Sequence, residues 1–337
     1  MEKETPLKSY LNNLLEQYQL KIDYIRPWLF YNQLEEALLQ DNKNKTLDEV
    51  FNGETIETEY GETYKIETTE KLNFHLKEDT KAKENIITDL KLLPNIGPVR
   101  EKKLKDEGYT TIHSLTEHTK FKYSAENFIE TIQRSSISET ITVVKKNYSG
   151  SHPKILDCAS LADYDNFKFM DIETLGLSNV PVILIGVSEL EKNKITTTQY
   201  LLKSSKDEQS ILNSFINHIT DESIFVTYNG ASFDIPFIKQ RFFFYQQRVP
   251  LNQCHLDLYH MSRRLWNNQL PNFQLTTVEK YLFNLKRTCD VPGEYIPHYY
   301  KSYLQDKNPG PLIPIIEHNR IDIVSLAKIL KRMTLPP

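Results

Sequence analysis

The stretch FKFMDIET, residues 167–174, decides the fold expected of this chain. Its first four residues are mostly apolar and indicate a buried strand, and Asp171 and Glu173 stand at the end of that strand. Alternate residues of a strand point to the same side, so the two carboxylates share a face. Two carboxylates at the end of a buried strand are costly unless a cation neutralises them, and a divalent cation is the usual one. On its own, however, the triplet also fits solvated residues in a turn.

The sequence that follows predicts an α/β domain. VILIGVSEL (182–190) and ITTTQYLL (195–202) indicate two more strands, and IFVTY (224–228) indicates a fourth. Helical spacing appears at 207–219, 233–247 and 311–332. Three strands followed by helix, strand and helix are typical of a mixed sheet.

Two further motifs carry acids. In VTYNGASFDIPFI (226–238), Asp234 follows an apolar strand and a glycine turn, although it could simply cap the helix that follows. In EHNRIDIVSL (317–326), His318 and Asp322 are four positions apart and share one face of a helix. A surface pair is the alternative interpretation of those two residues.

The three motifs together resemble the DnaQ-like DEDD exonucleases of the RNase H-like superfamily. Asp171 and Glu173 match the first motif, Asp234 the second, and Asp322 with His318 the third. The chain is more closely similar to the YprB-type RNase H-like nucleases, through HLDLYHMSRRLW (255–266), TCDVPGEYIPHYY (288–300) and LIPIIEHNRIDIVSLAKIL (312–330). The resemblance covers roughly 166–332 and extends to GETIETEYGETYKIE (53–67).

The resemblance implies a two-metal site for phosphodiester hydrolysis. Asp171 would bridge two Mg²⁺ or Mn²⁺ ions, Glu173 and Asp322 would complete the shell of the first, and Asp234 would hold the second. Such hard cations prefer the oxygen ligands that carboxylates supply. His318 would orient or deprotonate the attacking water. Three residues separate His318 from Asp322, whereas the histidine branch of the superfamily usually has four, so His318 is expected to sit differently from that branch's general base.

Other residues near the motifs are candidates for contact with nucleic acid. For Asp257, in CHLDL, we expect support of the site or a helix cap rather than direct metal ligation. Ordinary solvated arginines or core residues are the alternative for the contact set. The set consists of Leu177, Asn229, Phe233, Arg263, Arg264 and Arg287.

LLPNIGPVREKKLKDEGYTTIHSL, residues 92–115, resembles a helix-hairpin-helix module. The hairpin of such a module presents backbone N–H groups to a phosphate at a helix N-terminus. Asn95 and Gly97 lie in the expected hairpin, and Arg100 and Lys102 follow it. A structural hairpin that only packs domains is the alternative.

Four regions are expected along the chain. Residues 1–80 would form helices and a β-hairpin, because Ile56, Tyr64 and their neighbours alternate around Gly61. Residues 84–135 would form the helix-hairpin-helix region, 136–165 a linker, and 166–337 the RNase H-like DEDD exonuclease domain. The fold class is therefore an α/β RNase H-like mixed sheet flanked by helices, preceded by a helical region and a small α+β segment.

Composition narrows the function further. The 337 residues hold 41 Lys and Arg against 45 Asp and Glu, a net charge of −4, which excludes coating of nucleic acid by bulk charge. No apolar run is long enough for a membrane span, and three cysteines without a CxxC pair suggest a reducing, cytoplasmic setting. The resemblance implies a metal-dependent 3′–5′ exonuclease, and the helix-hairpin-helix segment favours DNA, single-stranded or with a free 3′ end, as its substrate. The YprB-type resemblance further suggests a role in repair with a DNA helicase as partner. The alternatives are an RNA exonuclease, an inactive nucleic-acid-binding adaptor and a small-molecule phosphatase.

Overall fold

One mixed sheet forms the centre of the computed structural model, which describes residues 5–22, 26–134, 136–249, 251–287 and 289–335. Its strand order is β1-β2-β5-β4-β3-β6-β7, antiparallel from β1 to β3 and parallel from β3 to β7. The sheet confirms the predicted mixed α/β architecture. The strands are β1 Gly53–Thr58, β2 Gly61–Lys71, β3 Phe167–Thr174, β4 Val182–Glu191, β5 Lys194–Leu201, β6 Ile224–Thr227 and β7 Cys254–Asp257.

The predicted N-terminal hairpin is present as β1 and β2, with Thr58 opposite Gly61 at the turn. Strand β2 then pairs with β5, from Tyr64 opposite Leu201 onward. The hairpin therefore extends the C-terminal sheet, and residues from the expected 1–80 and 166–337 regions share it. Long-range pairing of this kind is decided by tertiary structure and leaves no local signal in the sequence.

Strand β3 separates two hydrophobic cores. Phe167 and Phe169 pack into one core, while Met170 packs into the other, on the opposite face of the sheet. Because the side-chain period of a strand is two, Asp171 and Glu173 continue the face of the two phenylalanines. The acids thus stand at the end of a face whose first half is fully buried.

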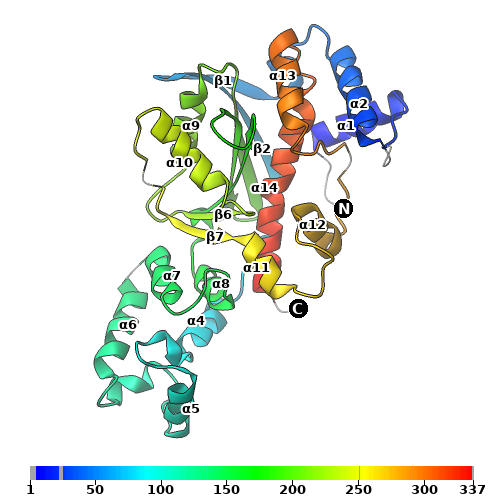
Figure 1. Cartoon of the computed structure of the whole chain (residues 1–337). Coiled ribbons are helices and arrows are strands. Elements are labelled where there is room, and N and C mark those ends of the chain that lie inside the picture. Colours follow the sequence, from blue (N-terminus) through cyan, green and yellow to red (C-terminus); the bar gives the residue numbers. More distant parts are fainter. Residues whose placement is uncertain (1–4, 23–25, 135, 250, 288, 336–337) are drawn as a thin grey trace.

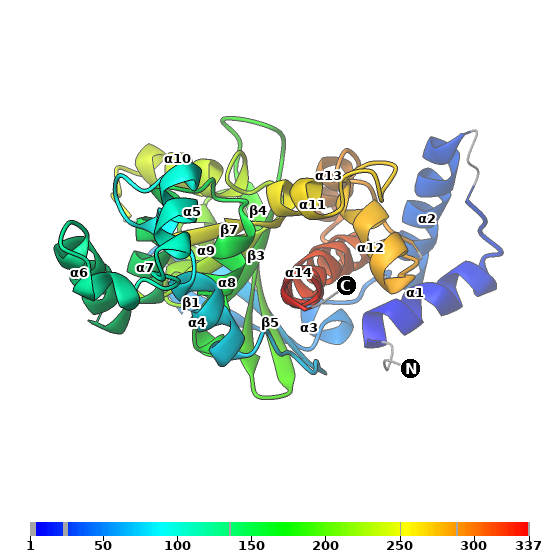
Figure 2. The ribbon, with the colours of Figure 1, turned by 90° about the horizontal axis from the view of Figure 1, so that it is seen from below.

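Helix α14, Leu312–Thr334, lies along that face of the sheet, and Figure 2 shows it nearly end-on beside the strands. Ile323 packs into the same core as Phe169. Arg320 of α14 pairs with Glu317 one turn earlier and with Glu70 of β2. The pair with Glu317 lies within α14, whereas the pair with Glu70 joins the helix to the sheet at β2.

Helices surround the sheet on both faces (Figure 1). Helices α9 and α10 pack with the core that contains Met170, and α11 and α12 pack with the core that contains Phe169. Helices α1 and α2 cover α13 and the first half of α14. The helices are α1 Pro6–Gln17, α2 Pro27–Asp41, α3 Leu47–Val50, α9 Glu208–Ile216, α10 Asp234–Phe244, α11 Leu258–Leu265, α12 Leu275–Phe283 and α13 Ile296–Asp306.

A second group of helices, here called the helical lobe, forms one end of the molecule in Figure 1. It covers residues 79–159, and its core is continuous with that of β3 and α14. The segment 136–165, expected as a linker, is instead largely helical, because apolar residues such as Ile141 and Ile155 bury helix faces there. The lobe contains α4 Asp79–Ile87, α5 Pro98–Asp106, α6 Lys122–Arg134, α7 Ile137–Lys145 and α8 Pro153–Ala159.

The three cysteines are buried and unbridged. Burial raises the pKa of the Cys158 and Cys289 thiols to about 12. They therefore act as small apolar core residues rather than as nucleophiles or redox groups. Within the described ranges, every helix is too short or too polar to cross a lipid bilayer.

Candidate active site and nucleic-acid surface

The structure brings the three acidic motifs together. Asp171 and Glu173 end β3, Asp234 begins α10, and Asp322 lies on α14. The backbone N–H of Ile172 donates to Asp234 Oδ1 at 3.2 Å, which ties the second motif to the first. We call the four carboxylates the acid cluster.

Burial and mutual repulsion dominate the chemistry of the acid cluster. Desolvation raises the pKa of Asp171 well above its ordinary value, and the charges of Glu173, Asp234 and Asp322 raise it further. Desolvation also raises the pKa of Glu173 to about 8 and that of Asp234 to about 7. Carboxylates held in this way favour either protons or a nearby cation.

His318 is drawn into the cluster as a cation. Its Nε2 lies 3.8 Å from Glu173 Oε1 and 3.7 Å from Asp322 Oδ2, and its Nδ1 lies 2.6 Å from Asp290 Oδ1. Burial alone would lower the pKa of His318, but the charge of Asp322 and the contact with Asp290 outweigh burial and raise it to about 10. Without further positive charge nearby, the imidazole is protonated at neutral pH and cannot accept a proton from water.

Arg287 corrects one of the predicted nucleic-acid contacts. Its side chain is only 6% exposed and makes a two-pronged ion pair with Glu279, with N–O distances of 2.7 and 2.6 Å. It also lies 2.5 Å from Asp322 Oδ1 and 3.4 Å from Asp290 Oδ2. The guanidinium therefore pairs with internal carboxylates, and it is not exposed to an incoming phosphate. The sequence predicted a phosphate contact because the two partners that Arg287 approaches most closely, Glu279 and Asp322, lie 8 and 35 residues away along the chain.

The donor set fits a hard divalent cation, although the side chains are not arranged around one. In the part of the chain that the structure describes, no group of three or more His, Cys, Asp or Glu side chains is placed to hold a metal ion. Yet the cluster offers only carboxylate oxygens, which Mg²⁺ and Mn²⁺ prefer. Asp322 Oδ1 is buried and makes no hydrogen bond, because its close contact with Arg287 lacks hydrogen-bond geometry. Burial and repulsion among the carboxylates favour a cation beside them, and at Asp322 the Arg287 guanidinium lies in that position.

Asn319 is a site residue that the sequence analysis missed. Its Nδ2 donates to Asp171 Oδ2 at 2.9 Å and to the Asp171 carbonyl at 3.2 Å, and its Oδ1 accepts from Gln199 Nε2 at 2.9 Å. Gly186, opposite Asp171 on β4, leaves the space, since a Cβ there would lie 2.2 Å from Asn319 Oδ1. The sequence signal was a polar residue at helical spacing from Ile316 and Ile323, on a face of α14 that is otherwise apolar there.

Asp257 holds the loop that precedes Asp234. Its two carboxylate oxygens accept from the backbone N–H groups of Asn229, at 2.9 Å, and Ala231, at 3.1 Å. Oδ1 also accepts from the backbone N–H of Tyr259 and so caps α11. Asn229 adopts a left-handed backbone with φ of 65° and is exposed, so its side chain is accessible in the loop that precedes Asp234.

The remaining predicted nucleic-acid contacts are two apolar residues and two arginines. Leu177, in the loop between β3 and β4, is 86% exposed, whereas Phe233 is half-buried and packs against Phe237 with ring centroids 5.3 Å apart. Arg263 and Arg264 are exposed on α11. In the described ranges, neither arginine pairs with a carboxylate; the Arg264 guanidinium instead donates to two serine hydroxyls of the helical lobe.

The expected hairpin at residues 93–97 leads directly into α5. Asn95 takes a left-handed backbone with φ of 65°, Gly97 caps the helix, and the Arg100 guanidinium donates to the Asn95 carbonyl. Nothing lies within 4 Å of where a Cβ of Gly97 would be. The backbone of the turn is therefore open to a ligand, and Lys102 is exposed beside it.

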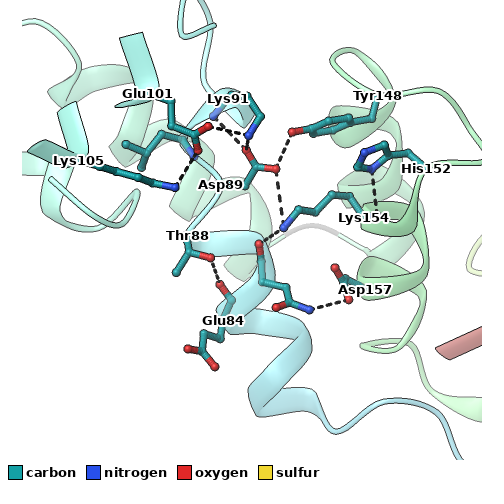
Figure 3. A network of polar contacts seen from close by, with 12 residues as sticks. Glu84, Thr88, Asp89, Lys91, Glu101, Lys105, Tyr148, His152, Lys154 and Asp157 are labelled. Carbon is teal, nitrogen blue, oxygen red and sulfur yellow. Dashed lines mark hydrogen bonds and ion pairs between the residues drawn. The ribbon is translucent and has the colours of Figure 1, made fainter. Parts of the chain in front are cut away.

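A network of polar contacts anchors this hairpin, as Figure 3 shows. Asp89 accepts from Tyr148 at 2.6 Å and pairs with Lys91 at 2.9 Å. Glu101 of α5 pairs with Lys91 at 2.7 Å and with Lys105 at 3.0 Å. The hairpin helices are thus tied to the segment between α7 and α8.

Comparison with known proteins defines the class. A model of the RNase H superfamily matches residues 168–334, so this part of the chain is an RNase H superfamily domain. The uncharacterized protein YprB of Bacillus subtilis (strain 168) is 32% identical over 175 residues, which are 50% of this chain and 42% of that protein. A DNA polymerase of Pyrococcus glycovorans is 27% identical over 145 residues, 34% of this chain and 18% of the polymerase. The chain thus spans less than half the length of either relative, and the predicted superfamily and YprB-type resemblance are confirmed.

Proposed function

We propose that this chain is a metal-dependent 3′–5′ exonuclease that hydrolyses phosphodiester bonds of DNA. The single observation that carries the proposal is the convergence of Asp171, Glu173, Asp234 and Asp322 from three separate motifs. The polarity of degradation, and cooperation with a DNA helicase in repair, come from the YprB-type resemblance.

The four carboxylates would hold two Mg²⁺ or Mn²⁺ ions. Such ions lower the pKa of bound water and offset the charge that develops on the phosphate. Added positive charge would also lower the pKa of His318 from its value in the ion-free cluster, because the carboxylate charges that raise it would be neutralised. Asp290, which contacts His318 Nδ1, would hold the ring orientation, leaving Nε2 directed at the cluster.

The proposal is tested by degradation of end-labelled single- and double-stranded DNA and RNA, with Mn²⁺ or with EDTA. Nucleotide release from the 3′ end of DNA that depends on Mn²⁺ supports it. Equal or faster release from matched RNA would reassign the substrate. Hydrolysis of nucleotide monoesters without any polymer cleavage would favour the small-molecule phosphatase instead.

The DNA preference rests on the hairpin at residues 93–97, so Gly97→Glu with Lys102→Glu should weaken DNA binding. Glutamate fits at position 97 without strain, since the space around it is open, and it places negative charge where a phosphate would approach. We expect about a tenfold loss of affinity and a shallower dependence on salt, as each lost phosphate contact lowers the slope by about 0.7 to 0.9. Fluorescence anisotropy with a labelled duplex carrying a single-stranded end measures both.

The matched control is Lys206→Glu with Lys301→Glu, two exposed lysines near α9 and on α13. These elements lie away from α5 in Figure 1. Affinity and salt slope should stay at wild-type values in the control. If the hairpin variant also kept both values, the hairpin would have only a packing role.

Asn319 is expected to position Asp171, so Asn319→Ala should weaken metal-dependent activity. Loss of such a partner typically costs about 10- to 100-fold in metal affinity or activity. We expect a higher Mn²⁺ concentration for half-maximal hydrolysis, with DNA affinity in EDTA unchanged. Asn213→Ala, which removes a half-buried amide on α9, is the control. An unchanged Mn²⁺ dependence in Asn319→Ala would exclude the positioning role.

A nucleic-acid-binding adaptor without catalysis is the second candidate. The contact between Arg287 and Asp322 favours it, because a guanidinium already neutralises one of the four acids. A calorimetric titration of the protein with Mn²⁺ distinguishes the exonuclease from the adaptor. An adaptor would bind DNA but show no carboxylate-dependent uptake of Mn²⁺.

A further inference from the structure

A basic pocket lies where the helical lobe meets the sheet domain. It has a volume of about 880 Å³. Lys145 and the turn at residues 149–151 line it from the lobe, and His260, Arg263 and Arg264 line it from α11 and the residues near it. Below, "basic pocket" refers to the site formed by these residues.

Little negative charge offsets the cations of the basic pocket. Asp257 is the one acid among its lining residues, and both of its oxygens already accept backbone N–H groups. Lys145 donates to the carbonyl of His255 rather than to a carboxylate. Burial lowers the pKa of His255 to about 4, so that ring is neutral and adds a polar but uncharged wall. The site therefore suits an anion.

Arg264 is held ready for a ligand. Its Nε donates to Ser151 Oγ at 3.2 Å and its Nη2 donates to Ser149 Oγ at 2.9 Å. A guanidinium has five N–H donors in a fixed plane, so these two bonds orient the group and leave donors for a phosphate. Neutral hydroxyls, unlike the carboxylates around Arg287, do not cancel its charge.

The position of the basic pocket connects the two regions already described. On one side, Asp257 and Ala231 belong to its lining, and Ala231 lies three residues before Asp234 of the acid cluster.

The other side of the basic pocket connects to the hairpin. Asn147 donates to the Leu92 carbonyl at 3.2 Å, which ties the lobe's lining turn to the hairpin. The Tyr148 hydroxyl bonded to Asp89 in Figure 3 adds to that tie. A strand that contacted both the hairpin and the cluster would meet this pocket.

We infer that the basic pocket binds the phosphodiester backbone of the nucleic-acid strand whose end enters the acid cluster. The direction of that strand rests on the proposed function, whereas the affinity for the backbone does not. Arg264, whose guanidinium the two serines already orient, would donate to one phosphate. Arg263 and Lys145 would contact the neighbouring phosphates. The helical lobe and the RNase H domain would thus grip one strand jointly.

The test compares the full chain with Arg263→Glu plus Arg264→Glu. Both arginines are exposed, so the substitutions leave the core intact. Binding of a labelled single-stranded oligodeoxynucleotide is measured in EDTA, where no cleavage is needed. We expect an affinity at least about tenfold lower and a salt slope shallower by about one to two. Lys206→Glu with Lys301→Glu carries the same change of charge and should bind as the wild type does.

Two further measurements keep the outcomes distinct. Hydrolysis of thymidine 5′-monophosphate p-nitrophenyl ester with Mn²⁺ requires the acid cluster but no long strand, so the rate of the wild type tests the proposed function separately from strand binding. If the wild type hydrolysed no phosphodiester while the variant still lost affinity, the proposed function would fail and the pocket would stand. Wild-type affinity and salt slope in the variant would overturn the inference. Full competition by free thymidine monophosphate would also overturn it, since the site would then bind a terminal phosphate rather than a backbone.

Discussion

Asp171→Asn and Asp234→Asn are each expected to lower the Mn²⁺-dependent hydrolysis of DNA by at least about a thousandfold, equal to about 4 kcal/mol of transition-state stabilisation. The two residues lie on different elements, yet the Ile172 backbone joins them through its bond to Asp234. Asparagine keeps the shape and the accepting oxygen but removes the charge. The measurement is release of labelled nucleotide from a single-stranded substrate at saturating Mn²⁺. Activity within tenfold of the wild type in either variant would remove the cluster from catalysis.

Stability should change in the opposite direction, which separates lost chemistry from misfolding. In EDTA, burial and repulsion raise the pKa of Asp234 to about 7. The folded state therefore holds its proton more tightly than the unfolded state, so the free energy of unfolding falls as pH rises from about 4 to about 7. Asp234→Asn has no proton to lose at this position, so it removes this fall in the free energy of unfolding. At pH 8 in EDTA, the variant should unfold at a higher urea concentration than the wild type, and added Mn²⁺ should stabilise only the wild type strongly.

Arg287→Met is expected to destabilise the protein by about 3 to 5 kcal/mol, because it leaves buried carboxylates without their cation. Arg287 contacts Glu279, Asp290 and Asp322 within 3.4 Å, and Glu279 is 1% exposed. Methionine keeps the aliphatic length, so packing alone changes little. Urea unfolding at neutral pH in EDTA measures the effect.

The control is Arg263→Met, an exposed arginine with no carboxylate partner in the described ranges, which should change stability by less than about 0.5 kcal/mol. At pH 4 the penalty of Arg287→Met should shrink, because burial raises the pKa of Glu279 and a protonated Glu279 needs no cation. An equal, small effect of both substitutions would mean that the ion pairs around Arg287 contribute little.

Much of the local structure followed from the sequence. The alternation in 54–70 predicted β1 and β2, and the apolar runs from Phe167 to Thr227 predicted β3 to β6. Periodicity reports which face of an element is buried, and that depends on near neighbours along the chain. The segment 136–165 was misread as a linker because its Ser, Gly and Pro residues mark the ends of short helices there, not a long connection.

The partners of charged side chains were beyond sequence reasoning. Arg287 looked like a phosphate contact, but in the fold it neutralises Glu279 and Asp322. Asn319 carried no motif of its own, yet it reaches Asp171 through space left by Gly186. In both cases the partner comes from a different element, and a side chain's spacing along the chain does not reveal it.

By itself, the sequence determined the order and local setting of the acids: a strand end, a helix start and one face of a helix. Those settings are properties of a few consecutive residues, which local propensity and periodicity fix. Only the tertiary structure decided which charges meet. It packs α14 against β3, buries Arg287 among three carboxylates and leaves Arg263 and Arg264 exposed beside the lobe. Electrostatic energy depends on distance and burial, and both are set by packing between elements far apart in the chain.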